Sequence, residues 1–124
     1  MTLSLDHLVI MGRDAAASRA FYADLLPLLG FERRRDDIWV NNDGLHLQVL
    51  QAEAGTRAYE RRGPGLNHLG FGAPDAAFVE DVRDAMLARG HAIQPIQHLG
   101  GAHALFMPDP DGLRVEVTWY PPGN

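Results

Sequence analysis

Two histidines and two side chains with an acid or amide group occupy matching positions in a sequence that repeats itself. His7 and His68 follow an acid or amide residue in the patterns Leu-Asp-His-Leu and Leu-Asn-His-Leu. Gln48 and Glu116 follow an Asp-Gly-Leu turn signal at the same spacing. Imidazole nitrogens combined with carboxylate or amide oxygens suit Zn(II), Ni(II), Co(II), Mn(II) or Fe(II), whereas Ca(II) and Mg(II) prefer oxygen ligands. The pattern therefore predicts a divalent metal site made of His7, His68, Glu116 and, as a weaker fourth ligand, Gln48.

Each of these side chains also has an ordinary structural interpretation. A single histidine on a strand is more often a hydrogen-bonded structural residue than a ligand, but two at repeat-equivalent positions reverse that expectation. Gln48 can instead hydrogen-bond a water beside the metal. His46 shares the expected face of Gln48, and His103 precedes the last turn, so both are candidate substrate-binding residues. The alternative for His46 is a place on the rim of the site.

The elements that must position these residues repeat in the same order. Alternating apolar residues predict strands, and helical spacing predicts two helices. The strands are expected over 3–11, 31–35, 38–41, 45–51, 66–72, 92–96, 103–107 and 113–119, and the helices over 15–29 and 76–89. Pro27 should kink or end the first helix early, and Gly30 should cap it.

The repeat predicts an α+β fold of two pseudo-symmetric βαβββ modules within one domain spanning 1–124. Module one covers 1–52, a polar linker covers 53–65, and module two covers 66–120. Two concave sheets of this kind can form an incomplete barrel around a metal-centred cavity. If the first and last strands of each module are neighbours, the four candidate ligands can converge there.

Composition narrows the possible partners and compartment. The 124 residues carry a formal net charge of −5, and their 11 basic residues form only short runs, which argues against nucleic-acid binding. Hydrophobic residues make up 46% of the chain, enough for a packed interior. Cysteine is absent, which excludes disulfides and thiolate chemistry. Without a secretory signal or an apolar span, a soluble cytoplasmic protein with no membrane partner is expected.

Several segments together resemble the vicinal oxygen chelate superfamily, which contains glyoxalases, bleomycin-resistance proteins and extradiol dioxygenases. The segments are 5–9, 21–31, 67–71 and 109–112, together with Glu116. The resemblance covers nearly the whole chain and implies paired βαβββ modules. It places His7, His68 and Glu116 on metal-ligand positions and Gln48 on the fourth position. It also implies a homodimer and a small-molecule substrate whose vicinal oxygens bind the metal, which acts as a Lewis acid.

The resemblance leaves the reaction open. A metal-dependent lyase or isomerase of the glyoxalase-like kind comes first, with Glu116 as ligand and catalytic proton-transferring base. Met11 and Ala52 stand where bacterial glyoxalase I has the arginine and asparagine that bind glutathione, so another substrate is expected. An extradiol-type dioxygenase is the alternative, although Phe106 stands where those enzymes have a tyrosine. A bleomycin-like binding protein usually lacks these metal ligands. A thiol transferase of the fosfomycin-resistance kind needs basic residues for a phosphonate that the sequence does not reveal.

Overall fold

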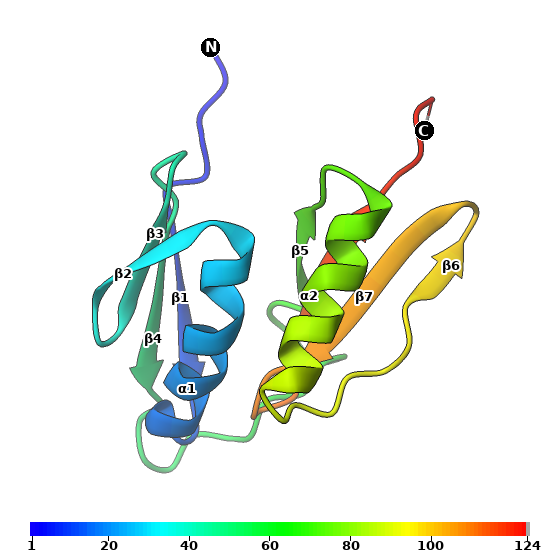
Figure 1. Cartoon of the computed structure of the whole chain (residues 1–124). Helices are drawn as coiled ribbons and strands as arrows, with labels where there is room; N and C mark the ends of the chain where they lie inside the picture. The colour runs from blue at the N-terminus through cyan, green and yellow to red at the C-terminus, as the bar shows by residue number, and fades with distance from the viewer. Residues whose placement is uncertain (124) are drawn as a thin grey trace. The chain divides into compact units, whose positions relative to one another are not determined.

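The protein divides into two compact units, with the boundary between Ala58 and Tyr59. The computed structural model describes residues 1–123. The boundary lies inside the segment 53–65, which the sequence analysis interprets as a linker. Each unit contains one α-helix and a four-stranded sheet in the order strand, helix, strand, strand, strand (Figure 1). The predicted α+β fold of paired βαβββ modules is therefore confirmed.

In the first unit, the first and last strands are direct neighbours. The sheet order is β1-β4-β3-β2, with β1 parallel to β4 and the other pairs antiparallel. The helix α1 packs on one face of this sheet, and the apolar side chains between them form the core. The elements are β1 (His7–Gly12), α1 (Ala15–Leu25), the 3₁₀ turn η1 (Leu26–Leu29), β2 (Phe31–Arg35), β3 (Ile38–Asn41) and β4 (His46–Gln51).

Local chemistry sets the bounds of α1. Asp14 caps its first turn by accepting a hydrogen bond from the Ala17 amide at 3.3 Å. Pro27 ends the regular helix early, as predicted, and the chain continues as η1 to Leu29. Gly30 then adopts a left-handed conformation with φ of 90°, which favours glycine because it has no Cβ.

The first predicted strand begins later than the sequence pattern suggests. Leu3 and Leu5 are 83% and 60% exposed, and residues 1–6 form no strand. Pairing with β4 begins at His7, which lies opposite His46. The alternating apolar residues before His7 therefore have no neighbouring strand within this unit to complete their hydrogen bonds.

The second unit repeats the topology of the first. Its sheet order is β5-β8-β7-β6, with β5 parallel to β8, and α2 packs against β7 and β8. Asp75 caps α2 by accepting from the Phe78 amide at 2.8 Å, which matches the role of Asp14 in the first unit. The elements are β5 (His68–Gly72), α2 (Ala76–Ala88), β6 (Gln97–Leu99), β7 (Ala102–Pro108) and β8 (Arg114–Trp119).

The strand predicted over 92–96 is wrong, because the structure places the short strand β6 immediately after it. Pro95 has no backbone N–H to donate to a neighbouring strand. The carbonyl groups of Ile93 and Gln94 accept hydrogen bonds from the Arg83 guanidinium of α2, at 3.3 and 3.0 Å. A side chain of the helix thus replaces a neighbouring strand as the partner of this segment.

Both sheets are open. β1 and β2 are the edges of the first sheet, and β5 and β6 are the edges of the second, so neither sheet closes on itself by hydrogen bonding. The predicted metal-centred cavity within an incomplete barrel stays a prediction. None of the helices in residues 1–123 combines the length and the apolar character that crossing a membrane requires.

Candidate metal centre

The two histidines and the two oxygen donors have the same register in the two units. In the β1/β4 pair, Gln48 lies opposite the residue two positions after His7. In the β5/β8 pair, Glu116 lies opposite the residue two positions after His68. Because side chains alternate between faces with a period of two, each histidine shares a face with its unit's oxygen donor. The sequence repeat therefore places one imidazole and one oxygen donor on the helix-free face of each sheet.

In the first unit, two carboxylates orient the candidate ligands. His7 Nδ1 lies 2.8 Å from Asp6 Oδ2, and this hydrogen bond lowers the pKa of the Asp6 carboxyl. The ionised carboxylate only accepts, so His7 donates from Nδ1 and its Nε2 presents a lone pair. Gln48 Nε2 donates a hydrogen bond to Asp37 Oδ2 at 2.9 Å, and this bond lowers the pKa of the Asp37 carboxyl. The amide oxygen of Gln48 is then the atom available as a metal ligand.

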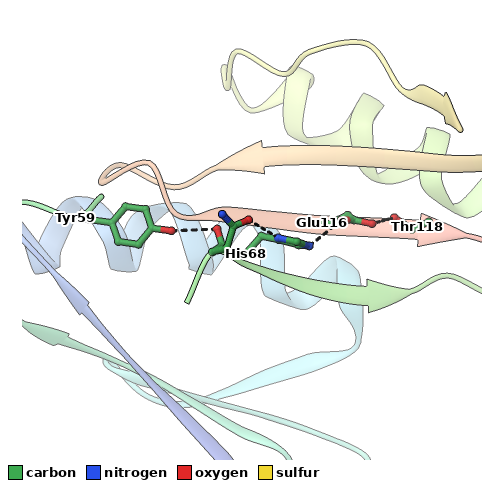
Figure 2. A network of polar contacts seen from close by, with 5 residues as sticks. Tyr59, His68, Glu116 and Thr118 are labelled. Carbon is green, nitrogen blue, oxygen red and sulfur yellow. Dashed lines mark hydrogen bonds and ion pairs between the residues drawn. The ribbon is translucent and has the colours of Figure 1, made fainter. Parts of the chain in front are cut away.

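In the second unit, neutral groups orient the ligands. His68 Nδ1 lies 2.7 Å from Asn67 Oδ1 (Figure 2). Asn67 Nδ2 donates to the Arg61 carbonyl at 2.8 Å. The amide nitrogen of Asn67 is thereby fixed as the donor and its oxygen as an acceptor, so His68 donates from Nδ1. Its Nε2 faces Glu116 Oε1 at 3.5 Å. Glu116 Oε2 accepts a hydrogen bond from the buried Thr118 hydroxyl.

When His68 is neutral, its Nε2 and the facing Glu116 oxygen are both electron-rich. A neutral Nε2 lone pair opposite an ionised carboxylate oxygen is unfavourable unless a cation or a second imidazole proton lies between them. Two ligand atoms each about 2.1 Å from a tetrahedral metal are about 3.4 Å apart. The observed separation of 3.5 Å is therefore close to that of two ligands on one metal ion.

Tyr59 extends this network toward the start of the second unit. Its hydroxyl contacts the carbonyl oxygen of Leu66 at 2.7 Å. It also contacts the carbonyl oxygen of Asn67 at 3.0 Å (Figure 2). The chain entering β5 is therefore held on both sides of the residue that orients His68. Hydrogen bonds of this outer kind fix the tautomer and direction of a histidine ligand.

Sequence reasoning missed the orienting residues. Asp6 and Asn67 carried a usable signal, since each precedes the histidine in its copy of the repeat. Asp37 and Thr118 carried no such signal. Asp37 meets Gln48 through the pairing of two strands, and Thr118 meets Glu116 on one strand face, and the repeat alone specifies neither contact.

His46 lies where the sequence analysis expected it. It is opposite His7 in the register and lines a pocket of about 240 Å³ that Gln48 also lines. Its Nδ1 lies 2.8 Å from the Gly44 carbonyl oxygen, which can only accept, so Nε2 is left as an acceptor. A substrate contact from His46 stays a prediction.

His103 does not share the face of Glu116. Phe106 is directly opposite Glu116, and His103 is an odd number of residues away on the same strand. Its ring centroid lies 5.3 Å from that of Trp119 and 4.5 Å from that of His98. The structure thus does not bring His103 together with the other candidate site residues of its unit.

Space above the second half of the site comes from two glycines. Gly70 is opposite Glu116 and Gly72 is opposite Thr118, and an added Cβ at either would meet no other group within 4 Å. Both line a pocket of about 230 Å³ with His68 and Glu116. A small ligand can therefore approach the carboxylate over bare backbone.

Each unit offers two candidate metal ligands. Within residues 1–123, no group of three or more His, Asp or Glu side chains is arranged to hold a metal ion. The chemistry of the donor set nevertheless fits a divalent transition metal, because each unit offers one oriented Nε2 and one oxygen. His7 and Gln48 are the candidate ligands of the first unit, and His68 and Glu116 are those of the second.

Comparisons with known proteins agree with the fold. Residues 4–117 match the model of the Glyoxalase/Bleomycin resistance protein/Dioxygenase superfamily. The uncharacterized protein YqjT of Bacillus subtilis is 28% identical, over 92% of this chain and 97% of its own length.

Two solved structures share the arrangement of elements. A proposed glyoxalase from Bacillus halodurans has a TM-score of 0.80 and 27% identity, covering 94% of this chain and 95% of its own. A glyoxylase/bleomycin resistance protein/dioxygenase domain from Frankia has a TM-score of 0.80 and 21% identity, covering 100% and 96%, and at that identity it supports the fold alone. The repeat, the paired βαβββ topology and the match over 4–117 together show that this chain belongs to the Glyoxalase/Bleomycin resistance protein/Dioxygenase superfamily.

Proposed function

We propose that this chain is a divalent metal-dependent lyase or isomerase of the glyoxalase-like kind. Its substrate is a small molecule that offers two vicinal oxygens to the metal. When bound, the cation supplies a Lewis acid that polarises those oxygens and stabilises developing negative charge. His7, Gln48, His68 and Glu116 are the ligands in this proposal.

The observation that supports the proposal is the pairing of His68 with Glu116. Asn67 fixes Nδ1 of His68 as the hydrogen-bond donor, so the neutral imidazole presents its Nε2 lone pair toward Glu116, and Thr118 occupies the other carboxylate oxygen. The remaining two acceptor atoms face each other at 3.5 Å. A divalent cation resolves this arrangement without changing the hydrogen bonds around it. An imidazolium–carboxylate ion pair is the competing explanation, and metal binding separates the two.

The small number of candidate ligands in each half supports a contribution from the first half as well as from the second. Each half has two donors, whereas three protein ligands and an open position are usual in catalytic zinc sites. One half of each kind gives four donors with a single negative charge, supplied by Glu116. They come from one chain or, in a homodimer, from two.

Residues around the ligands suit proton transfer. Glu116 lines the pocket beside Gly70 and Gly72, and its Oε2 accepts from Thr118, so Oε1 can accept a substrate proton when it is not engaged. His46 has a free acceptor nitrogen beside His7 and can bind a substrate hydroxyl. Phe106, directly opposite Glu116, has no hydroxyl to donate, which favours a lyase or isomerase over the alternative dioxygenase.

The test is metal content, followed by activity. Purified protein, reconstituted with Zn(II) or Ni(II) and desalted, is expected to retain metal by elemental analysis. The variants His68→Ala and Glu116→Ala should lose it, whereas His98→Ala, an exposed histidine outside the candidate set, should retain it. Unchanged metal content in both site variants would overturn the proposal.

Two assays then separate the reactions. Formation of lactoylglutathione from the hemithioacetal tests the narrow glyoxalase I reaction. Oxygen uptake with catechols tests the dioxygenase, and uptake that depends on Glu116 would replace the proposed lyase or isomerase.

A further inference from the structure

A second cavity lies in the same unit as Glu116. It has a volume of about 340 Å³, and Arg61, Arg114 and Phe106 are among the residues that line it. Arg114 is the Cα partner of His68 and precedes Glu116 by two residues on β8, so all three share one face. Along a strand, two residues span about 6.6 Å. The cavity therefore adjoins the second half of the candidate metal centre.

The cavity combines positive charge with an apolar surface. The Arg114 guanidinium carbon lies 5.4 Å from the centroid of the Phe106 ring, and that ring faces Glu116 across the β7/β8 pair. Stacking on an aromatic face holds a guanidinium while leaving its N–H groups free to donate in the ring plane. Asp111 is the one carboxylate among the lining residues, so the cationic side chains outnumber it.

Arg61 is held near the cavity through the same network that orients His68. Its carbonyl accepts from Asn67 Nδ2 at 2.8 Å, and Tyr59, which also lines the cavity, contacts the Asn67 carbonyl at 3.0 Å. The segment 59–67 thus contacts the residue that orients His68 and also contributes Arg61 to the lining of the cavity. Both Arg61 and Arg114 are only partly exposed.

We propose that this cavity binds the carboxylate of the substrate, and that the substrate is a small organic acid with an apolar frame. The inference rests on the proposed function and specifies its substrate class. A planar guanidinium matches a carboxylate with two parallel hydrogen bonds. The volume is near the lower end of ligand pockets, about 300–1,000 Å³, so the acid is small. Its carboxylate and its metal-facing oxygens are separated by the distance from Arg114 to Glu116.

Binding of benzoate to the metal-free protein tests this subsite separately from the metal. Benzoate and its neutral counterpart benzamide are titrated at low salt, following amide chemical shifts or heat. Benzoate should bind at least tenfold more tightly than benzamide. Arg114→Gln and Arg61→Gln should each weaken benzoate at least tenfold and leave benzamide unchanged. Arg62→Gln, the exposed neighbouring arginine that does not line the cavity, is the matched control and should bind as the wild type does.

The outcomes are distinct. Equal binding of the two probes, or an equal loss in Arg62→Gln, would overturn the inference, because the effect would then not depend on this cavity. Arg114→Lys keeps the charge but loses the planar guanidinium, so an affinity for benzoate between those of the wild type and Arg114→Gln supports a bidentate carboxylate. The same variant replaces Arg114→Gln as the test if Arg114→Gln fails to fold. Metal retention is measured on the same proteins. Normal metal content without benzoate binding refutes only the carboxylate subsite. Benzoate binding without metal retention refutes only the proposed function.

Discussion

The two halves of this chain share a backbone plan but place their negative charge differently. In the first half the candidate ligands, His7 and Gln48, are neutral, and carboxylates of Asp6 and Asp37 hold them. In the second half the candidate ligand Glu116 carries the charge. Neutral groups hold its site: Asn67 on the histidine, and the Thr118 hydroxyl on the carboxylate. The repeat preserves where the ligands lie and exchanges what surrounds them.

The residues beside the candidate ligands on β1 and β5 also differ between the two halves. Val9 and Met11 lie on the ligand face of β1 and are 47% and 49% exposed. The equivalent positions on β5 are Gly70 and Gly72. The first half therefore presents apolar side chains beside its donors, whereas the second presents open space beside Glu116.

This difference suggests a division of labour. A carboxylate that hydrogen-bonds a histidine raises its basicity as a ligand, which suits a half that only holds metal. A half with a charged ligand, open space and an adjoining cationic cavity suits substrate binding and proton transfer. The following variants test the comparison in order of expected effect.

Replacing the charged ligand should have the largest effect. Glu116→Gln makes the second half resemble the first and removes the only ionised ligand. It should weaken Zn(II) or Ni(II) binding by more than about 100-fold, beyond the usual cost of losing an outer hydrogen bond. Gln48→Ala should cost less, since it removes a neutral donor. Isothermal titration measures both, and a larger loss for Gln48→Ala would reverse the proposed roles of the halves.

Removing the orienting groups should have an intermediate effect. Asp6→Ala and Asn67→Ala free the imidazoles of His7 and His68, and each should weaken metal binding by about 10–100-fold. Asp6→Ala should cost more, because it also removes a charge close to the metal. Asp43→Ala, in an exposed turn, is the control. If both variants bind metal as tightly as the control does, the hydrogen bonds to Nδ1 have no part in ligand orientation.

Exchanging the residues beside the candidate ligands, Val9 on β1 and Gly70 on β5, should have the smallest effect. Gly70→Ala adds a methyl group into open space at a position without a positive φ, so it should raise the free energy of unfolding by about 0.5–1 kcal/mol. Val9→Gly should lower it by a similar amount or more. Urea denaturation measures both changes. Destabilisation by Gly70→Ala would mean that another group packs over Glu116.

Much of the fold could be predicted because its signals are local. The Asp-Gly-Leu turns, the Pro27 and Gly30 signals at the end of the first helix and the alternation around His68 each act over a few residues, and their repetition predicted two modules of the same topology. Errors arose where distant groups decide. The segment 92–96 looks like a strand, but its carbonyls bind a helix arginine.

Parts of the candidate site were also beyond the sequence. Asp37 meets Gln48 only because β3 pairs with β4. Arg61 joins the cavity through a loop with no periodic pattern, and its hydrogen bond to Asn67 depends on how that loop folds. Strand and helix patterns therefore did not predict the positions of these charged loop residues.

The central proposal is that His7, Gln48, His68 and Glu116 are metal ligands. The most direct measurement is the metal content per chain of His7→Ala and His68→Ala, prepared and reconstituted alongside the wild type. The account predicts about one ion per chain in the wild type and a loss of metal in both variants, because each half alone offers too few ligands. Full retention of metal by His7→Ala together with its loss in His68→Ala would contradict the claim and leave the second half as a site of its own.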